Sequence, residues 1–127
     1  MARTTRWLRI EGAALFLALI AAYATAGLSW ILFAALFLVP DLSMLGYLAG
    51  PRVGGAVYNV AHLYAWPALL LGAWAVTGVG WALGPGLVWG AHIAMDRALG
   101  YGLKEPHSFQ STHLGRIGKD PGRSAAA

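Results

Sequence analysis

Long apolar runs, rather than alternating or amphipathic patterns, dominate the order of hydrophobic and polar residues in this chain. Four runs follow one another, separated by short glycine-containing segments: about 7–26, 29–48, 56–76 and 81–100. Each approaches the ~20 residues that a helix needs to cross ~30 Å of hydrocarbon. Membrane-spanning strands would require alternation and shorter runs. The pattern predicts an all-α polytopic membrane protein, a bundle of four transmembrane helices.

The composition agrees with a membrane protein. The 127 residues are 58% hydrophobic and 11% charged, whereas soluble domains carry about 25% charged residues. The absence of cysteine excludes disulfides and thiolate metal sites. A cleaved signal peptide is the alternative for residues 1–26, but Glu11 would interrupt its apolar core and three further runs follow. We expect one membrane domain over 1–118 and a disordered end over 119–127.

Basic residues are placed asymmetrically. They lie before or at the start of the first run, between the second and third runs, and at or after the end of the fourth: Arg3, Arg6, Arg9, Arg52, Arg97, Lys104, Arg116, Lys119 and Arg123. The other two connections, around 27–28 and 77–80, carry no charge. The positive-inside rule then predicts that both termini are cytoplasmic, in the bacterial cytoplasmic (inner) membrane. The net charge of +4 thus indicates contact with membrane lipids and not with nucleic acid.

The ionisable residues inside the predicted helices lie at one depth. At 1.5 Å per residue, they fall ~6–12 Å from the cytoplasmic ends of their helices. They are Glu11, Asp41, His62, His92 and Asp96. A central charged residue costs about 2.5–3.5 kcal/mol on insertion scales, so we expect these side chains to face one another rather than lipid. His92 and Asp96 share a helix face at a spacing of four, and Pro40 and Pro67 interrupt backbone hydrogen bonding close to Asp41 and His62.

Imidazoles and carboxylates together are donors that zinc and other divalent metals accept. We therefore predict a divalent-metal site formed by Asp41, His62, His92 and Asp96. The alternative is acid–base catalysis by a histidine–carboxylate pair, and the candidate catalytic residues are Glu11, Asp41, His92 and Asp96. A structural explanation is also open, in which each histidine bonds a neighbouring helix and Glu11 pairs with nearby arginines. Five such residues at one depth favour a functional pocket.

Further polar residues lie near the same end of the predicted bundle. We predict that they hold the headgroup or phosphorylated part of a substrate: Tyr58, Asn59, Arg97, Lys104 and Arg116. Anchoring to anionic lipid is the simpler alternative for each of them. Gly100 and Gly102 are only a weak phosphate-binding signal, because no full glycine motif is present. Helices rich in glycine and alanine also permit close packing within a chain or between chains, so a homo-oligomer is compatible with the sequence.

Four sequence blocks resemble a family of small bacterial membrane proteins catalogued as domain of unknown function 4260. The blocks are WLRIEG, PDLSMLGYLAGPRVGGAVYN, HIAMDRALGYGLK and THLGRIG, and the resemblance covers roughly residues 7–118. It implies a four-helix membrane architecture. The family has no assigned activity, so no residue role is transferred from it.

Three classes of function follow from these observations. The first is a membrane-embedded enzyme, metal-dependent or acid–base, whose polar site in the cytoplasmic leaflet acts on a lipid-like substrate. The second is a small proton-coupled transporter, since chain length, four helices and Glu11 in the first helix resemble small multidrug-resistance exporters. The third is a non-catalytic structural or cofactor-binding bundle, for example with haem between His62 and His92, although no haem-attachment motif is present.

Overall fold

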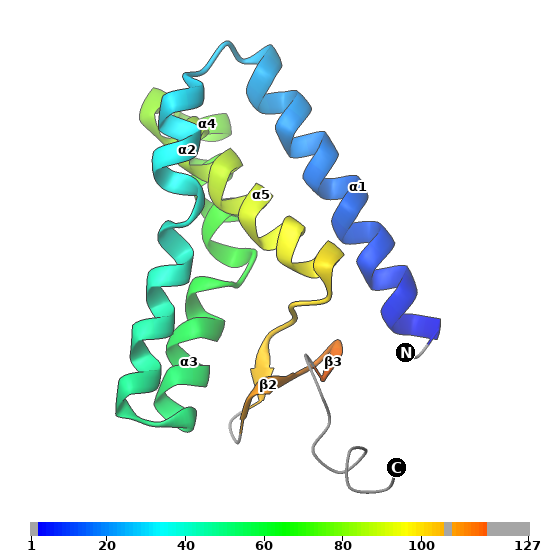
Figure 1. The fold of residues 1–127 in the computed structure, drawn as a ribbon. Coiled ribbons are helices and arrows are strands. Elements are labelled where there is room, and N and C mark those ends of the chain that lie inside the picture. Colours follow the sequence, from blue (N-terminus) through cyan, green and yellow to red (C-terminus); the bar gives the residue numbers. More distant parts are fainter. Residues whose placement is uncertain (1–2, 106–107, 117–127) are drawn as a thin grey trace, which may run out of the picture.

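The computed structural model describes residues 3–105 and 108–116 (Figure 1). The helices are α1 (Arg3–Thr25), α2 (Trp30–Phe37), the 3-10 helix η1 (Val39–Ala49), α3 (Pro51–Ala61), α4 (Ala65–Thr77), the short 3-10 helix η2 (Gly80–Ala82) and α5 (Leu83–Leu99). The strands β1 (Lys104–Glu105), β2 (Ser108–Thr112) and β3 (Gly115–Arg116) form an antiparallel sheet in that order. The predicted helical architecture is confirmed up to the end of α5, and the small sheet after it was not predicted.

Three helical segments in the described part of the chain are long and apolar enough to cross a membrane: Arg3–Thr25, Trp30–Ala49 and Pro51–Thr77. Few of their residues are buried within the chain, as expected where hydrocarbon rather than water surrounds the apolar side chains. The fourth apolar run is also helical. However, α5 has 17 residues, at the short limit of about 17–25 residues for a membrane span.

The sequence predicted one helix for each apolar run. The second and third runs instead each form two helical segments. The second run changes from α2 to η1 at Leu38, two residues before Pro40. Proline lacks a backbone donor, and its ring clashes with the preceding turn. The third run breaks between α3 and α4 at 62–64. Pro67 lies in the first turn of α4, where proline is tolerated. The two breaks place Asp41 and His62 at helix ends.

Helix α5 is the centre of the bundle and packs against α1, α2 and α4. Glycines allow this approach, because a Cβ at Gly12 would lie 2.8 Å from the backbone nitrogen of Ala98 and one at Gly86 would lie 2.9 Å from the Leu71 side chain. The predicted close packing through glycine therefore occurs within this chain.

The two ends of the bundle differ in composition. The α1–α2 and α4–α5 connections lie at one end, and the N-terminal end of α1, the η1–α3 turn and the sheet lie toward the other (Figure 1). Tyr23 of α1 packs with Leu87 and Val88, in the first half of α5, to form a buried apolar core. The second half of α5 carries His92 and Asp96, both buried. The polar residues of interest therefore lie beyond the apolar core.

Candidate metal centre

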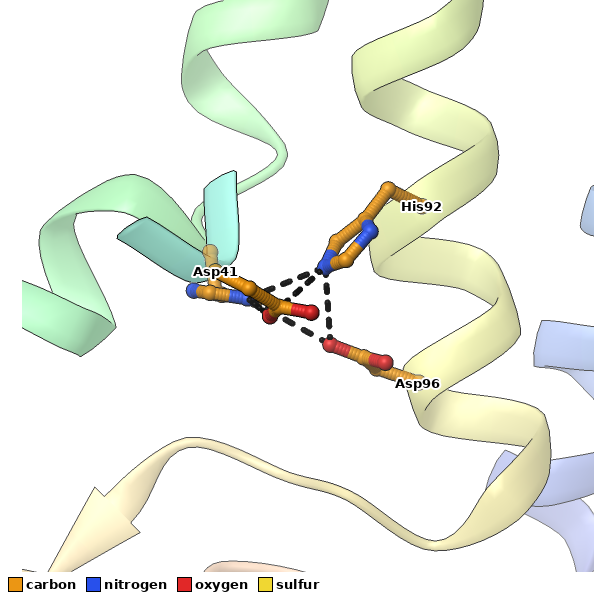
Figure 2. A group of neighbouring side chains, drawn as sticks. Asp41, His92 and Asp96 are labelled. Atoms are coloured by element: carbon orange, nitrogen blue, oxygen red, sulfur yellow. Dashed lines mark hydrogen bonds and ion pairs between the residues drawn. The ribbon is translucent and has the colours of Figure 1, made fainter. Parts of the chain in front are cut away.

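Four side chains from η1, the C-terminal cap of α3 and α5 converge on one point: Asp41, His62, His92 and Asp96. Figure 2 shows Asp41, His92 and Asp96 directed toward that point. Asp41 Oδ1 lies 3.3 Å from His62 Nε2 and 3.1 Å from His92 Nε2. Asp96 Oδ2 lies 3.3 Å from each of the same two nitrogens. The structure thus brings together the four residues that the sequence analysis proposed as metal ligands.

Hydrogen bonding among the four groups does not account for this arrangement. The two Nε2 atoms are also 3.3 Å apart, so each nitrogen has three close neighbours but only one proton or one lone pair to offer. In a tetrahedral zinc site with bonds of about 2.0 Å, the ligand atoms lie about 3.3 Å apart. Five of the six separations among the four atoms are 3.1–3.3 Å. The ligand atoms of all four residues lie within 4.8 Å of one another, so five edges of the tetrahedron match the spacing around a small divalent cation.

The same geometry argues against haem. A haem iron held by two histidines would need the porphyrin ring between the imidazoles. The Nε2 atoms of His62 and His92 are in contact at 3.3 Å, which leaves no space for that ring. The donor set of two imidazoles and two carboxylates instead suits zinc and related divalent metals.

Exposure divides the four ligands into three and one. The side chains of His62 and His92 are 0% exposed and that of Asp96 is 8% exposed, whereas that of Asp41 is 38% exposed. Asp41 is also the one member carried by the 3-10 helix η1. Three donors are therefore enclosed by the bundle, and the fourth lies at its accessible side.

His62 is oriented for metal binding by its neighbours. Its Nδ1 donates to the Tyr58 carbonyl oxygen at 2.8 Å, which leaves the Nε2 lone pair for an ion. The Tyr58 ring stacks on the imidazole, with centroids 3.7 Å apart and an interplanar angle of 13°. The Tyr58 hydroxyl donates to Asp96 Oδ2 at 3.4 Å. On the other side, the Phe37 ring packs edge-on against His92 at 5.4 Å.

The end of α3 is capped by three side chains that the sequence analysis did not assign to this role. Trp66 Nε1 donates to the Val60 carbonyl oxygen at 2.6 Å, and Trp89 Nε1 donates to that of Ala61 at 2.7 Å. Arg97 Nη2 donates to the His62 carbonyl oxygen at 3.1 Å. Carbonyls at a helix end need such partners where water is scarce. These hydrogen bonds hold the break at 62–64, and with it the position of His62. Pro67 was the signal that carbonyls would be free here, but it does not reveal their donors.

Four of the five residues predicted to hold a headgroup, Tyr58, Asn59, Arg97 and Lys104, contact the four ligands or the segments that carry them. The Asn59 side chain accepts from the Lys104 backbone N–H at 2.5 Å and donates to the Lys104 carbonyl at 2.8 Å, which joins β1 to α3. Lys104 is 4% exposed, and its Nζ lies 4.9 Å from the centre of the Tyr58 ring. Burial lowers the pKa of Lys104, and the nearby carboxylates of Asp96 and Asp41 oppose this shift. The side chain of Arg116 lies outside the described residues.

Glu11 does not join the four converging residues. It is exposed on α1 and lines a separate cavity of about 160 Å³ with Arg97 and His113. Arg97 itself donates to the backbone carbonyls of His62 and Tyr101. The carboxylate on which the exporter alternative depends is therefore not one of the converging groups, although all five residues were predicted at one depth.

A second cavity, of about 270 Å³, adjoins the centre. Its lining includes Leu36, Val39, Pro40, Ser43, Ala61 and Trp89. Pro40 directly precedes Asp41, Ala61 directly precedes His62, and Trp89 lies one turn before His92. The cavity is therefore walled by α2 and by the elements next to the converging side chains, although none of those four side chains lines it.

Comparison with known proteins agrees with this picture without adding a function. Neither the curated proteins nor the solved structures yield a significant match to the chain. The model of one family, described as a domain of unknown function (DUF4260), matches residues 5–117, which is nearly all of the chain and includes all four converging side chains. The resemblance drawn from the four sequence blocks is thereby confirmed, and the chain belongs to the DUF4260 family.

Proposed function

We propose that this protein is a membrane-embedded, metal-dependent enzyme whose ion is held by Asp41, His62, His92 and Asp96. The observation that carries the proposal is the near-equal separation of four donor atoms, 3.1–3.3 Å for five of the six pairs. A zinc-type ion fits this donor set and spacing. We place the centre in the cytoplasmic leaflet and expect a lipid-like substrate.

The unequal exposure of the ligands suggests how the centre works. His62, His92 and Asp96 form the enclosed set, and two histidines with one carboxylate are a recurrent ligand set of hydrolytic zinc enzymes. A zinc-type ion lowers the pKa of a bound water to about 7. Asp41, the most exposed of the four ligands, would be the residue placed to act as a general base toward a water molecule at the accessible side. We propose hydrolysis, in which the elements of water add across an ester, amide or phosphoester bond.

A non-catalytic ion is the second candidate, because four protein ligands already complete a tetrahedral site. The two candidates differ in what they predict for Asp41→Ala. An enzyme with an accessible fourth position keeps about one ion per chain with the three enclosed ligands. If the ion is structural, Asp41→Ala and His62→Ala should lower the metal affinity and the thermal stability of the protein to a similar extent.

The first experiment is elemental analysis of protein purified without chelators, comparing the parent with both variants. We expect stoichiometric divalent metal in the parent, retention in Asp41→Ala and loss in His62→Ala. Glu11→Ala is the matched control, since its exposed carboxylate lies outside the centre. A parent without stoichiometric metal would refute the proposal, and equal loss in Asp41→Ala and His62→Ala would establish the structural candidate.

We also propose that α5 is the fourth membrane span and that both termini are cytoplasmic, in the bacterial inner membrane. The α1–α2 and α4–α5 connections lie at one end of the bundle, and the N-terminal end of α1 and the η1–α3 turn lie toward the other, which supports this topology (Figure 1), as does the placement of basic residues. A Gly78→Cys variant places a thiol in the α4–α5 connection. We expect an impermeant maleimide to label it from outside spheroplasts, and labelling only after lysis would reverse the orientation.

A further inference from the structure

The 270 Å³ cavity beside the centre has a position that suits a substrate site. It is bounded by α2, η1, the end of α3 and α5, and the last three of these elements carry or directly precede the converging side chains. The accessible carboxylate of Asp41 directly follows the cavity residue Pro40. The exposed ligand of the centre is therefore carried by a residue that adjoins the cavity wall in sequence.

The polar groups of the cavity wall are already engaged. Ser43 Oγ donates to the Pro40 carbonyl oxygen at 2.7 Å, and Trp89 Nε1 donates to the Ala61 carbonyl oxygen at 2.7 Å. The remaining lining includes Leu36, Val39 and the Trp89 ring. Because polar groups that are desolvated without partners are costly, this wall favours hydrocarbon over a polar ligand.

Size restricts the occupant further. The cavity, at about 270 Å³, is slightly smaller than the ~300–1,000 Å³ of sites that enclose drug-sized ligands. It has room for one short hydrocarbon chain or a small apolar group, and not for the two chains of a bulk phospholipid.

We propose that this cavity binds the single hydrocarbon chain of an amphipathic substrate and thereby presents the substrate's polar, reactive group at Asp41. This inference names the substrate class of the proposed enzyme. The reaction depends on the proposed function, whereas binding of the hydrocarbon chain does not. Single-chain esters, amides or phosphoesters are the corresponding chemical class.

Photolabelling in phospholipid nanodiscs tests the binding, because there the surrounding lipid has two chains. Two diazirine probes are compared, one a single-chain decanoyl amphiphile and the other a two-chain phospholipid, and the labelled residues are mapped by mass spectrometry. We expect the single-chain probe to label the cavity residues, Val39 and Ser43 among them, several-fold more than the two-chain probe. Equal labelling by both probes, or labelling confined to outward residues such as Leu42, would overturn the proposal.

Variants that fill the cavity provide the second arm. Ser43→Trp and Val39→Trp should each reduce single-chain labelling several-fold while leaving metal content unchanged. Leu42→Trp is the matched control, because Leu42 is on the same helix, 63% exposed and absent from the lining. Labelling that persists in both filled variants contradicts the proposal. His62→Ala, which should lose the ion, is expected to bind the single-chain probe as the parent does. A parent that lacks stoichiometric metal but still binds the probe selectively would refute the proposed enzyme and leave this inference standing.

Discussion

The two halves of α5 are stabilised by different kinds of interaction. The first half packs Leu87 and Val88 against Tyr23 of α1 in an apolar core. The second half directs His92 and Asp96 toward two residues from other helices at separations of 3.1–3.3 Å. Apolar packing is non-directional and tolerates exchange of similar volumes, whereas the polar half depends on particular donor atoms in particular places. One helix thus provides both the packing of the bundle and half of the candidate metal centre.

The largest effect is expected in the polar half. His62→Ala removes one donor of four and leaves two carboxylates close to a single imidazole. We expect a loss of metal affinity larger than the ~10–100-fold that is typical when an outer-shell partner is removed. Isothermal titration of the chelator-treated protein with Zn²⁺ measures this change. Unaltered affinity in a folded His62→Ala protein would remove the distinction between the two halves.

Leu87→Ala tests the apolar half. Leu87 is 5% exposed within the core, and truncation of a buried leucine costs about 2–5 kcal/mol of stability. Thermal unfolding in detergent should therefore shift to lower temperature, while the folded fraction binds metal as the parent does. If Leu87→Ala instead lowered metal affinity without lowering the unfolding temperature, the apolar half of α5 would contribute directly to the metal centre, and the distinction between the halves would be wrong.

Trp89→Phe has an intermediate effect, because it removes the indole donor to the Ala61 carbonyl but keeps an aromatic ring. An unsatisfied buried carbonyl costs about 1–3 kcal/mol, and His62 follows Ala61 directly. We expect both a lower unfolding temperature and a modest fall in metal affinity. Trp81→Phe is the control at a residue that is 72% exposed, and an equal effect there would refute the capping role.

The smallest effect concerns Lys104 and pH. Burial lowers the pKa of Lys104 below its ordinary value of 10.5 in the folded protein, so between these two pKa values the unfolded chain binds more protons. Stability should therefore rise with pH across that interval. Lys104→Met should flatten the rise, as measured by thermal unfolding between pH 7 and pH 10. A parent and variant with the same pH dependence would contradict the assigned burial.

Hydropathy predicted the helical runs, because burial in hydrocarbon constrains them strongly, and the predicted common depth grouped Asp41, His62, His92 and Asp96, which the structure brings together. They did not predict the transition at Leu38 or the break at 62–64 as helix ends, since proline allows either a kink or a break. They also grouped Glu11 with the other four residues. Depth along a helix says nothing about direction around it, and the structure directs Glu11 to a different cavity. The capping by Trp89 and the sheet depend on contacts between distant segments, for which the local pattern carries no signal.

X-ray absorption spectroscopy of the metal in protein purified without chelators tests the central claim most directly. We expect one divalent ion per chain with nitrogen and oxygen ligands at about 2.0–2.2 Å, including multiple-scattering features of two imidazoles. In His62→Ala the contribution of one imidazole should disappear, or the ion should be lost. A parent without stoichiometric metal, or a spectrum without imidazole ligands, would contradict the assignment of Asp41, His62, His92 and Asp96 as a metal centre.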